Sequence, residues 1–132
     1  MRKENRLVSE ADFRRVRHEG RSWAHPLLVV HARRSDGAHF RAGVSVGKRV
    51  GGAVRRNRLR RRVRELLRAR LRELNPGWDV VISARPPAVS ASFAELGDAV
   101  DQLLRRARLR ATEPGPERDT LDTHRRPPGP SP

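Results

Sequence analysis

The alternation of apolar and polar residues predicts short helices and strands over roughly the first 111 residues. Ser9 followed by acidic residues is typical of a helix start, so we predict a short helix that ends before Gly20. Residues 23–33 are mostly apolar and predict a strand that ends at a turn over residues 35–37. Residues 39–47 alternate strictly and predict a strand that forms a hairpin with the first. The apolar face of this second strand holds Phe40, Ala42, Val44 and Val46.

The longest amphipathic pattern begins after Gly52 and predicts a helix that continues to the stop signal Asn75-Pro76-Gly77. At the helical period its large apolar side chains share an arc of about 100°, the width of a stripe that faces a core. These residues are Leu59, Val63, Leu66, Leu67 and Leu74. Arg70 projects into the same arc, so we expect either that its stem packs along the apolar surface or that the helix loosens there.

The last part of the pattern predicts one more strand and one more helix. Residues 78–84 form a nearly continuous apolar run that Pro86-Pro87 closes. Ser92 and Glu95 have the spacing of a capping box. The predicted face of the helix that follows holds Phe93, Leu96, Val100, Leu103, Leu104 and Ala107. The order α-β-β-α-β-α, with room for an extra short strand, predicts an α+β fold in which helices pack on a small sheet.

Residues 112–132 differ from the rest in composition. They hold six of the ten prolines and one large apolar residue, Leu121, so they bury too little to offset the entropy of ordering. We therefore predict a folded domain over residues 1–111 and a disordered, Pro-rich tail over residues 112–132. The net charge of the chain is +15 and that of the tail is −1, so the predicted folded part carries a net charge of +16.

The charge of the chain narrows the classes of partner. Lysine and arginine total 30 against 15 acidic residues, and all the basic residues except Lys3 and Lys48 are arginines. This charge favours a polyanionic partner, with nucleic acid first. The absence of cysteine excludes a disulfide scaffold and a thiol nucleophile, and it fits a cytoplasmic protein. No apolar run approaches the roughly 20 residues of a membrane span, and no signal peptide is visible, so we expect no membrane partner.

The basic residues concentrate in residues 48–72. This segment contains twelve lysine or arginine residues and one acidic residue, Glu65. On a helical wheel one group of polar side chains falls within an arc of about 80°. This group is Asn57, Arg61, Arg64, Arg68 and Arg72. Like charges at this spacing destabilise a free helix, so we expect phosphate groups to meet them. The small residues 50–53 lead into a helix N-terminus, where free N–H groups attract anions.

The segment Lys48 to Glu65, with Gly52-Ala53 and Arg56-Asn57-Arg58 within it, resembles the signature of the protein subunit of bacterial ribonuclease P. Ala11-Asp12-Phe13, Gly43-Val44-Ser45-Val46 and Asp79-Val80-Val81-Ile82 also resemble parts of that family. The resemblance extends over roughly residues 5–110.

The resemblance implies a fold and a task. The fold is a two-layer α-β sandwich of order α-β-β-β-α-β-α (ribosomal protein S5 domain 2-like) with a left-handed βαβ crossover, against the usual handedness. The implied partners are the catalytic RNA subunit, in a 1:1 complex, and precursor tRNA, whose 5′ leader is removed. Implied contacts with the catalytic RNA are Lys48, Arg49, Arg55, Arg56, Asn57, Arg58, Arg60, Arg61, Arg64 and Arg68.

A cleft between the first helix and the sheet would hold the single-stranded leader. By position, Phe13, Arg17, His31 and Arg33 would line this cleft. Relatives commonly carry aromatics where Arg17 and His31 stand, so base stacking would rest on Phe13 with some help from these two. The alternatives are that Phe13 is a core residue of an amphipathic helix and that His31 is an ordinary surface histidine of a strand.

No residues suggest that the protein itself cuts RNA. The five histidines lack the spacing of metal ligands, and we expect Glu95, Asp98 and Asp101 on the solvent side of the last helix. Glu65 reads as a local ion pair with Arg61. We therefore predict no catalytic residue and no protein metal site. The chain would be the subunit of an endoribonuclease whose RNA carries out the hydrolysis, with Mg²⁺ held mainly by the RNA.

Three other functions are compatible with a small basic protein. A ribosomal or other structural RNA-binding protein without a processing role is the main alternative, since composition alone does not separate it. A DNA-binding regulator would need a second short helix placed for a helix-turn-helix, which the pattern lacks. A stand-alone metal-dependent nuclease would need a cluster of ligands.

Overall fold

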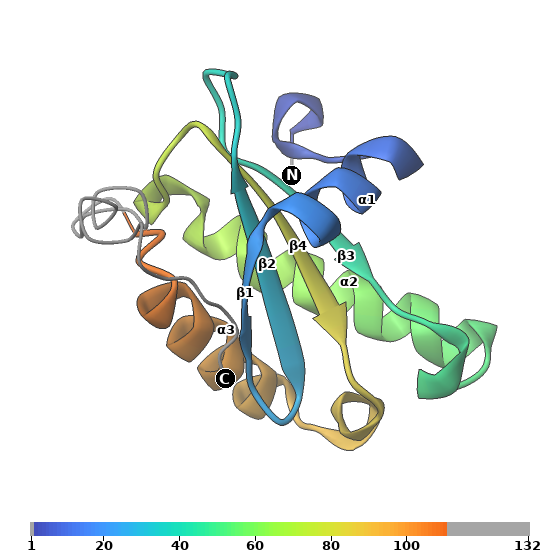
Figure 1. Ribbon diagram of the computed structural model, residues 1–132. Coiled ribbons are helices and arrows are strands. Elements are labelled where there is room, and N and C mark those ends of the chain that lie inside the picture. Colours follow the sequence, from blue (N-terminus) through green and yellow to red (C-terminus); the bar gives the residue numbers. More distant parts are fainter. Residues whose placement is uncertain (1, 111–132) are drawn as a thin grey trace.

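The computed structural model describes residues 2–110, so the predicted tail over residues 112–132 lies outside the described residues (Figure 1). The main elements are α1 (Glu10–Glu19), β1 (Arg21–Ala24), β2 (Leu28–Arg34), β3 (Arg41–Ser45), α2 (Ala53–Arg70), β4 (Trp78–Ala84) and α3 (Phe93–Arg106). Short 3₁₀ turns are η1 (Lys3–Asn5), η2 (Lys48–Val50), η3 (Leu71–Glu73) and η4 (Pro86–Ser90). The order α-β-β-β-α-β-α is the one that the resemblance implied.

The four strands pair in the order β1-β2-β4-β3. The predicted single strand over residues 23–33 is wrong, because the chain turns at Pro26 and forms the antiparallel hairpin of β1 and β2. The predicted hairpin of residues 23–33 with 39–47 is also wrong, since β4 lies between β2 and β3. The first five residues of β4 are all buried, and a strand that is apolar on both faces belongs in the middle of a sheet.

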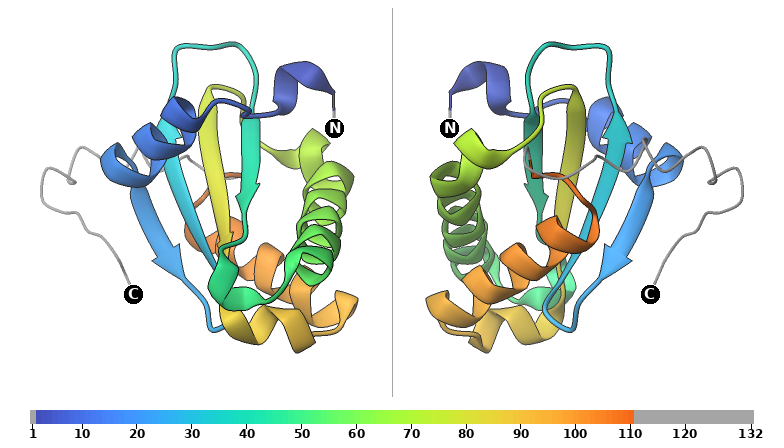
Figure 2. Two further views of the ribbon diagram at one scale, coloured as in Figure 1. Left: turned by 90° about the vertical axis from the view of Figure 1, so that its right-hand side faces the viewer. Right: turned by 90° about the vertical axis from the view of Figure 1, so that its left-hand side faces the viewer.

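The sheet has helices on both faces, as Figure 2 shows. Helices α2 and α3 pack on one face, where Val80 and Ile82 of β4 belong to the main core. Helix α1 lies across the other face, where Val81 packs with Leu7 and Val16. Strands β3 and β4 are parallel neighbours that α2 connects, and this crossover is left-handed (Figure 1).

The helix ends largely follow the predicted signals. The Ser9 side chain accepts a hydrogen bond from the Asp12 N–H, and Ser92 and Glu95 form the predicted capping box. Helix α2 ends at Arg70 rather than at residue 74, and the 3₁₀ turn η3 continues it. Phe93 is 45% exposed, contrary to prediction, because it begins α3 and the buried stripe starts one turn later at Leu96.

Asp79 lies at the start of β4. Within the described part of the chain it is the one charged residue that is buried, with 3% of its surface exposed. Arg41 on the neighbouring strand β3 binds it with two hydrogen bonds, from Nε to Oδ1 at 2.9 Å and from Nη2 to Oδ2 at 2.7 Å. The Nη1 atom of Arg41 also lies 3.7 Å from Oδ2 of Asp12 in α1. This ion pair therefore compensates the buried carboxylate and joins the sheet to α1.

Asp101 is half-buried in an ion-pair network, so the prediction that it belongs to a solvated face is wrong. Arg70 at the end of α2 donates from Nε to Oδ1 of Asp101 at 2.6 Å and from Nη2 to Oδ2 at 3.1 Å. Arg110 donates to the same carboxylate at 3.3 Å. Arg70 also donates to the Leu66 carbonyl at 2.9 Å. These hydrogen bonds compensate the charge of Arg70 at a position where the other side chains of the arc are apolar.

These contacts predict how stability depends on pH. The hydrogen bond from Arg70 holds the pKa of Asp101 below its ordinary value of 3.8. A carboxylate with a lowered folded-state pKa stabilises the fold above its unfolded pKa and ceases to do so as the pH falls through the folded pKa. We expect Asp101→Asn to lower the free energy of unfolding at pH 7 by about 1–2 kcal/mol. The difference from wild type should shrink below about pH 4.

Urea unfolding at pH 7 and pH 3 measures this difference. Asp98→Asn is the matched control, because Asp98 lies on the same helix and is exposed, and its charge acts on Arg70 without a hydrogen bond or ion pair. Its effect should stay within about 0.5 kcal/mol at both pH values. Equal losses for the two variants would contradict a specific role of the Asp101 network.

Candidate nucleic-acid interface

Helix α2 presents basic side chains to solvent around most of its circumference. Its buried stripe of Leu59, Val63, Leu66 and Leu67 packs on the core as predicted. The side chains that point away from this stripe form what we call the α2 basic face, which consists of Asn57, Arg61, Arg64 and Arg68. Arg72 does not continue this face, because it lies in η3 after the helix has ended. The loop before α2 exposes Lys48 and Arg49 as well.

The α2 basic face contains few compensating charges. Glu65 is its one nearby acid and accepts hydrogen bonds from Arg68, not from Arg61 as predicted. This bond lowers the pKa of Glu65, and the Glu-before-Arg order follows the helix dipole. Asn57 Oδ1 accepts from Arg60 at 2.6 Å, which leaves its amide N–H groups to donate to a ligand.

Arg64 shows how crowded the positive charges are. Partial burial lowers the pKa of its guanidinium, and the nearby charges of Arg6 and Arg60 lower it further. Arginine stays protonated at neutral pH despite such a shift. A bound phosphate would relieve this repulsion, so the local electrostatics favour an anionic ligand.

A pocket of about 320 Å³, which we call the α1 pocket, lies between α1, β3 and α2. It brings together two of the predicted leader contacts, Phe13 and Arg17, and adds Arg60 from α2. Arg17 donates from Nη1 to the Ser45 hydroxyl at 3.3 Å, so its guanidinium is held over the end of β3. The remaining lining residues are Val8, Glu10, Val44, Ser45 and Val46.

Phe13 lies directly against the backbone of β3 at Gly43. A Cβ atom at position 43 would stand 2.2 Å from the Phe13 Cζ, so the ring occupies the space that any other side chain would need. Phe13 is half-buried: it packs against the small core of Leu7, Val16 and Val81 and also lines the α1 pocket. It therefore combines the core role and the surface role that the sequence left open. Gly43 was not identified as part of the site from the sequence.

The other two predicted leader contacts stand farther along β2. His31 lies on the same face of the sheet as α1, opposite Val81, and does not line the α1 pocket. Burial lowers its pKa and the charge of Arg17 lowers it further, which favours a neutral imidazole at neutral pH. Arg33 donates from Nε to Glu19 Oε1 at 2.9 Å and is also outside the pocket.

Over residues 2–110 no three His, Asp or Glu side chains gather in a way that would hold a metal ion. None of the helices in that range is long and apolar enough to cross a membrane.

Comparison with known proteins gives consistent similarities. The family model for Ribonuclease P matches residues 1–108. The ribonuclease P protein component of Herpetosiphon aurantiacus is 42% identical over 109 residues, which cover 83% of this chain and 89% of that protein. Its counterpart from Clostridioides difficile is 36% identical over 101 residues, covering 76% of this chain and 89% of that protein.

Solved structures give the same result. The RNase P protein of Staphylococcus aureus superposes with a TM-score of 0.74 at 30% identity and covers 80% of this chain and 96% of its own. The RNase P protein of Thermotoga maritima gives a TM-score of 0.68 at 30% identity, with 76% and 96% covered. The likeness therefore holds for sequence and for fold over nearly all of the described residues.

Proposed function

Because the chain belongs to the ribonuclease P protein family and is thus a component of an endoribonuclease of tRNA processing, we propose that it binds the catalytic RNA through α2 and the 5′ leader of precursor tRNA in the α1 pocket. The observation that carries the first part is the α2 basic face, exposed and backed by a buried leucine-rich stripe. Each guanidinium group presents a planar fork of donors to phosphate oxygens, and several of them along one helix face would neutralise neighbouring phosphates of an RNA backbone.

The α1 pocket supports the second part of this proposal. Single-stranded nucleotides are bound by stacking on aromatic rings and by contacts from arginine to phosphate. Phe13 supplies a ring, while Arg17 and Arg60 supply charge from both sides of the pocket. His31 and Arg33 would contact nucleotides farther along the leader, on the α1 face of β2.

In this function the RNA subunit performs the hydrolysis, in a 1:1 cytoplasmic complex. Mg²⁺ would be held mainly by the RNA, whose phosphate oxygens are ligands that Mg²⁺ prefers. The protein residues would position the substrate and neutralise crowded phosphates. The resulting cationic charge would lower the Mg²⁺ concentration that the reaction needs.

Reconstitution tests this function directly. We expect the purified protein alone to leave precursor tRNA intact, and the cognate catalytic RNA to cleave it at low Mg²⁺ only when the protein is added. The assay follows the release of the 5′ leader on a gel. Cleavage by the protein without RNA would contradict the assignment, and so would a failure of the protein to stimulate the RNA at low Mg²⁺.

The salt dependence of binding tests the α2 basic face. If the three arginines of the α2 basic face together with Lys48 and Arg49 neutralise five phosphates, the slope of log K against log salt is roughly −3.5 to −4.5. The double variant Arg61→Ala plus Arg64→Ala should flatten this slope by roughly 1.4 to 1.8 and weaken binding to the catalytic RNA. Circular dichroism should stay unchanged.

Arg105→Ala is the control for this experiment, because it removes an exposed charge from α3, away from the α2 basic face. Its slope should equal that of the wild type. If the double variant also kept the wild-type slope, α2 would not be part of the interface.

A further inference from the structure

A second pocket, of about 390 Å³, lies between the N-terminal half of α2 and the turn η4 that joins β4 to α3. We call it the η4 pocket. Its lining residues are Arg55, Arg58, Leu59, Arg62, Val89, Ser90 and Ala91. Arg58 in this pocket and Arg60 in the α1 pocket are separated by about 200° around the helix. The two pockets therefore open on different sides of α2.

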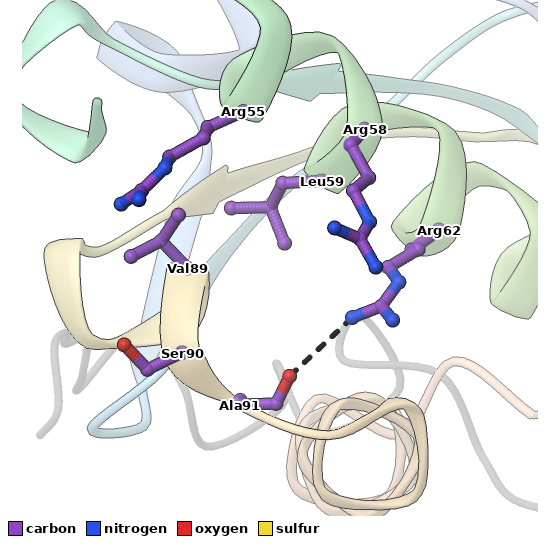
Figure 3. A pocket seen from close by; sticks show the side chains of 7 residues that line it. All are labelled: Arg55, Arg58, Leu59, Arg62, Val89, Ser90 and Ala91. Carbon is purple, nitrogen blue, oxygen red and sulfur yellow. Dashed lines mark hydrogen bonds between the residues drawn. The ribbon is translucent and has the colours of Figure 1, made fainter. Parts of the chain in front are cut away.

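The η4 pocket has a mixed lining with a definite arrangement, which Figure 3 shows. The side chains of Leu59 and Val89 lie in the middle, with the guanidinium group of Arg55 on one side and those of Arg58 and Arg62 on the other. Ser90, which is exposed, follows Val89 on η4. Leu59 is buried, with 3% of its surface exposed, and Val89 is half-buried, so the lining offers a small apolar area between two positively charged ends.

The charges of this pocket are not compensated within the described residues. No acidic residue lines it. Arg62 donates from Nη1 to the Ala91 carbonyl at 3.4 Å, which ties α2 to the end of η4. The guanidinium groups of Arg55 and Arg58 make no hydrogen bond or ion pair with any residue between 2 and 110. Two free guanidinium groups beside an apolar surface are suited to a ligand that is both anionic and flat.

We propose that the η4 pocket holds one unpaired nucleotide of the catalytic RNA, an inference that rests on the function proposed above. Its base would enter the pocket and lie against the half-buried Val89, next to the buried Leu59, and its flanking phosphates would meet Arg55 at one end and Arg58 at the other. The Ser90 hydroxyl would bond to the base edge or to the ribose 2′-OH. The volume lies within the range of about 300–1,000 Å³ of pockets that hold small ligands.

Two arguments select this ligand. A base inside a double helix is stacked on its neighbours, so a duplex could meet the guanidinium groups but could not insert a base into the pocket between them. The catalytic RNA is favoured over the leader because Arg55 and Arg58 belong to the helix that carries the α2 basic face, while the α1 pocket lies on another side of that helix.

The test uses the full chain with its cognate catalytic RNA. Ser90→Leu fills the pocket from an exposed position and leaves the net charge unchanged. We expect it to weaken binding on the order of tenfold without changing the salt slope. Dimethyl sulfate and a carbodiimide, which modify unpaired bases, should show one nucleotide that the wild-type protein protects and Ser90→Leu does not. All other protections should persist.

Arg58→Ala is a second variant that keeps the proposal testable if Ser90→Leu fails to fold. It should expose the same nucleotide, whereas Arg105→Ala should leave the protection pattern intact. Identical patterns for the wild type and both pocket variants would overturn the proposal. So would a change confined to the leader of precursor tRNA, or weaker binding by Arg58→Ala with no base exposed, which would indicate a phosphate contact alone. If the wild-type protein did not bind the catalytic RNA, the proposed function itself would fail.

Discussion

Replacing Arg41 by alanine is expected to lower the free energy of unfolding by about 3 kcal/mol, because the change leaves a buried carboxylate without its partner. Asp79 is 3% exposed and receives two hydrogen bonds from Arg41, at 2.9 and 2.7 Å. Removing one partner of a buried ion pair destabilises the fold strongly, because the other charge stays buried and unpaired. Replacing both partners with apolar residues changes the free energy of unfolding much less. The variant also loses the link from Arg41 to Asp12 in α1.

Urea unfolding at pH 7 measures this loss, and Arg15→Ala is the matched control. Arg15 also pairs with Asp12, at 3.2 Å, but on the exposed surface of α1. Such exposed pairs contribute about 0.2–1 kcal/mol. The double variant Arg41→Leu plus Asp79→Leu should recover most of the stability, because it removes both charges together. A small loss in Arg41→Ala, equal to that of Arg15→Ala, would show that water reaches Asp79.

Replacing Gly43 by alanine is expected to abolish most of the preference for leader-bearing precursor over mature tRNA. The new Cβ would stand 2.2 Å from the Phe13 Cζ, so the ring must leave its place at the α1 pocket. Base stacking on an aromatic ring contributes roughly 1–3 kcal/mol, so affinity for the precursor should fall roughly 5- to 150-fold. Overpacking should also lower the free energy of unfolding by about 1–3 kcal/mol.

Parallel binding assays with precursor and mature tRNA, on the enzyme reconstituted with its RNA, measure this preference. Phe13→Ala should give the same loss of preference, since it removes the ring itself. Gly37→Ala is the control, because a Cβ there would meet only the Ser35 Oγ at 3.6 Å. Equal losses on both tRNAs for Gly43→Ala and Phe13→Ala would exclude Phe13 as a leader contact.

The sequence predicted the helices better than it predicted the pairing of the strands. Capping signals such as Ser92 with Glu95 act within one turn, so they can be read locally. Alternation in residues 39–47 identified the buried side of β3 correctly, since Phe40, Ala42, Val44 and Val46 are all buried. Alternation does not say which strand lies alongside. The neighbour of β3 is β4, more than thirty residues away, and the family resemblance alone indicated such a crossover.

The candidate site shows the same division between local and distant information. The α2 basic face follows from helical spacing, and the prediction was wrong only in including Arg72. The contact of Phe13 with Gly43 and the packing of α2 against η4 depend on the tertiary structure. No local sequence pattern predicts these contacts. The same holds for Asp101, which looks like a surface residue until Arg70 and Arg110 are brought to it.

The left-handed connection between β3 and β4 decides which face of the sheet α2 covers. A right-handed connection would carry α2 across to the face that α1 occupies and would cover the strand surface around Val81 and Gly43. With the uncommon hand, α2 lies behind the sheet and reaches the α1 pocket only at its margin, through Arg60. In the function proposed above, one helix would anchor a large RNA on its outer surface while a second RNA strand would pass along the opposite side of the sheet, and neither would obstruct the other.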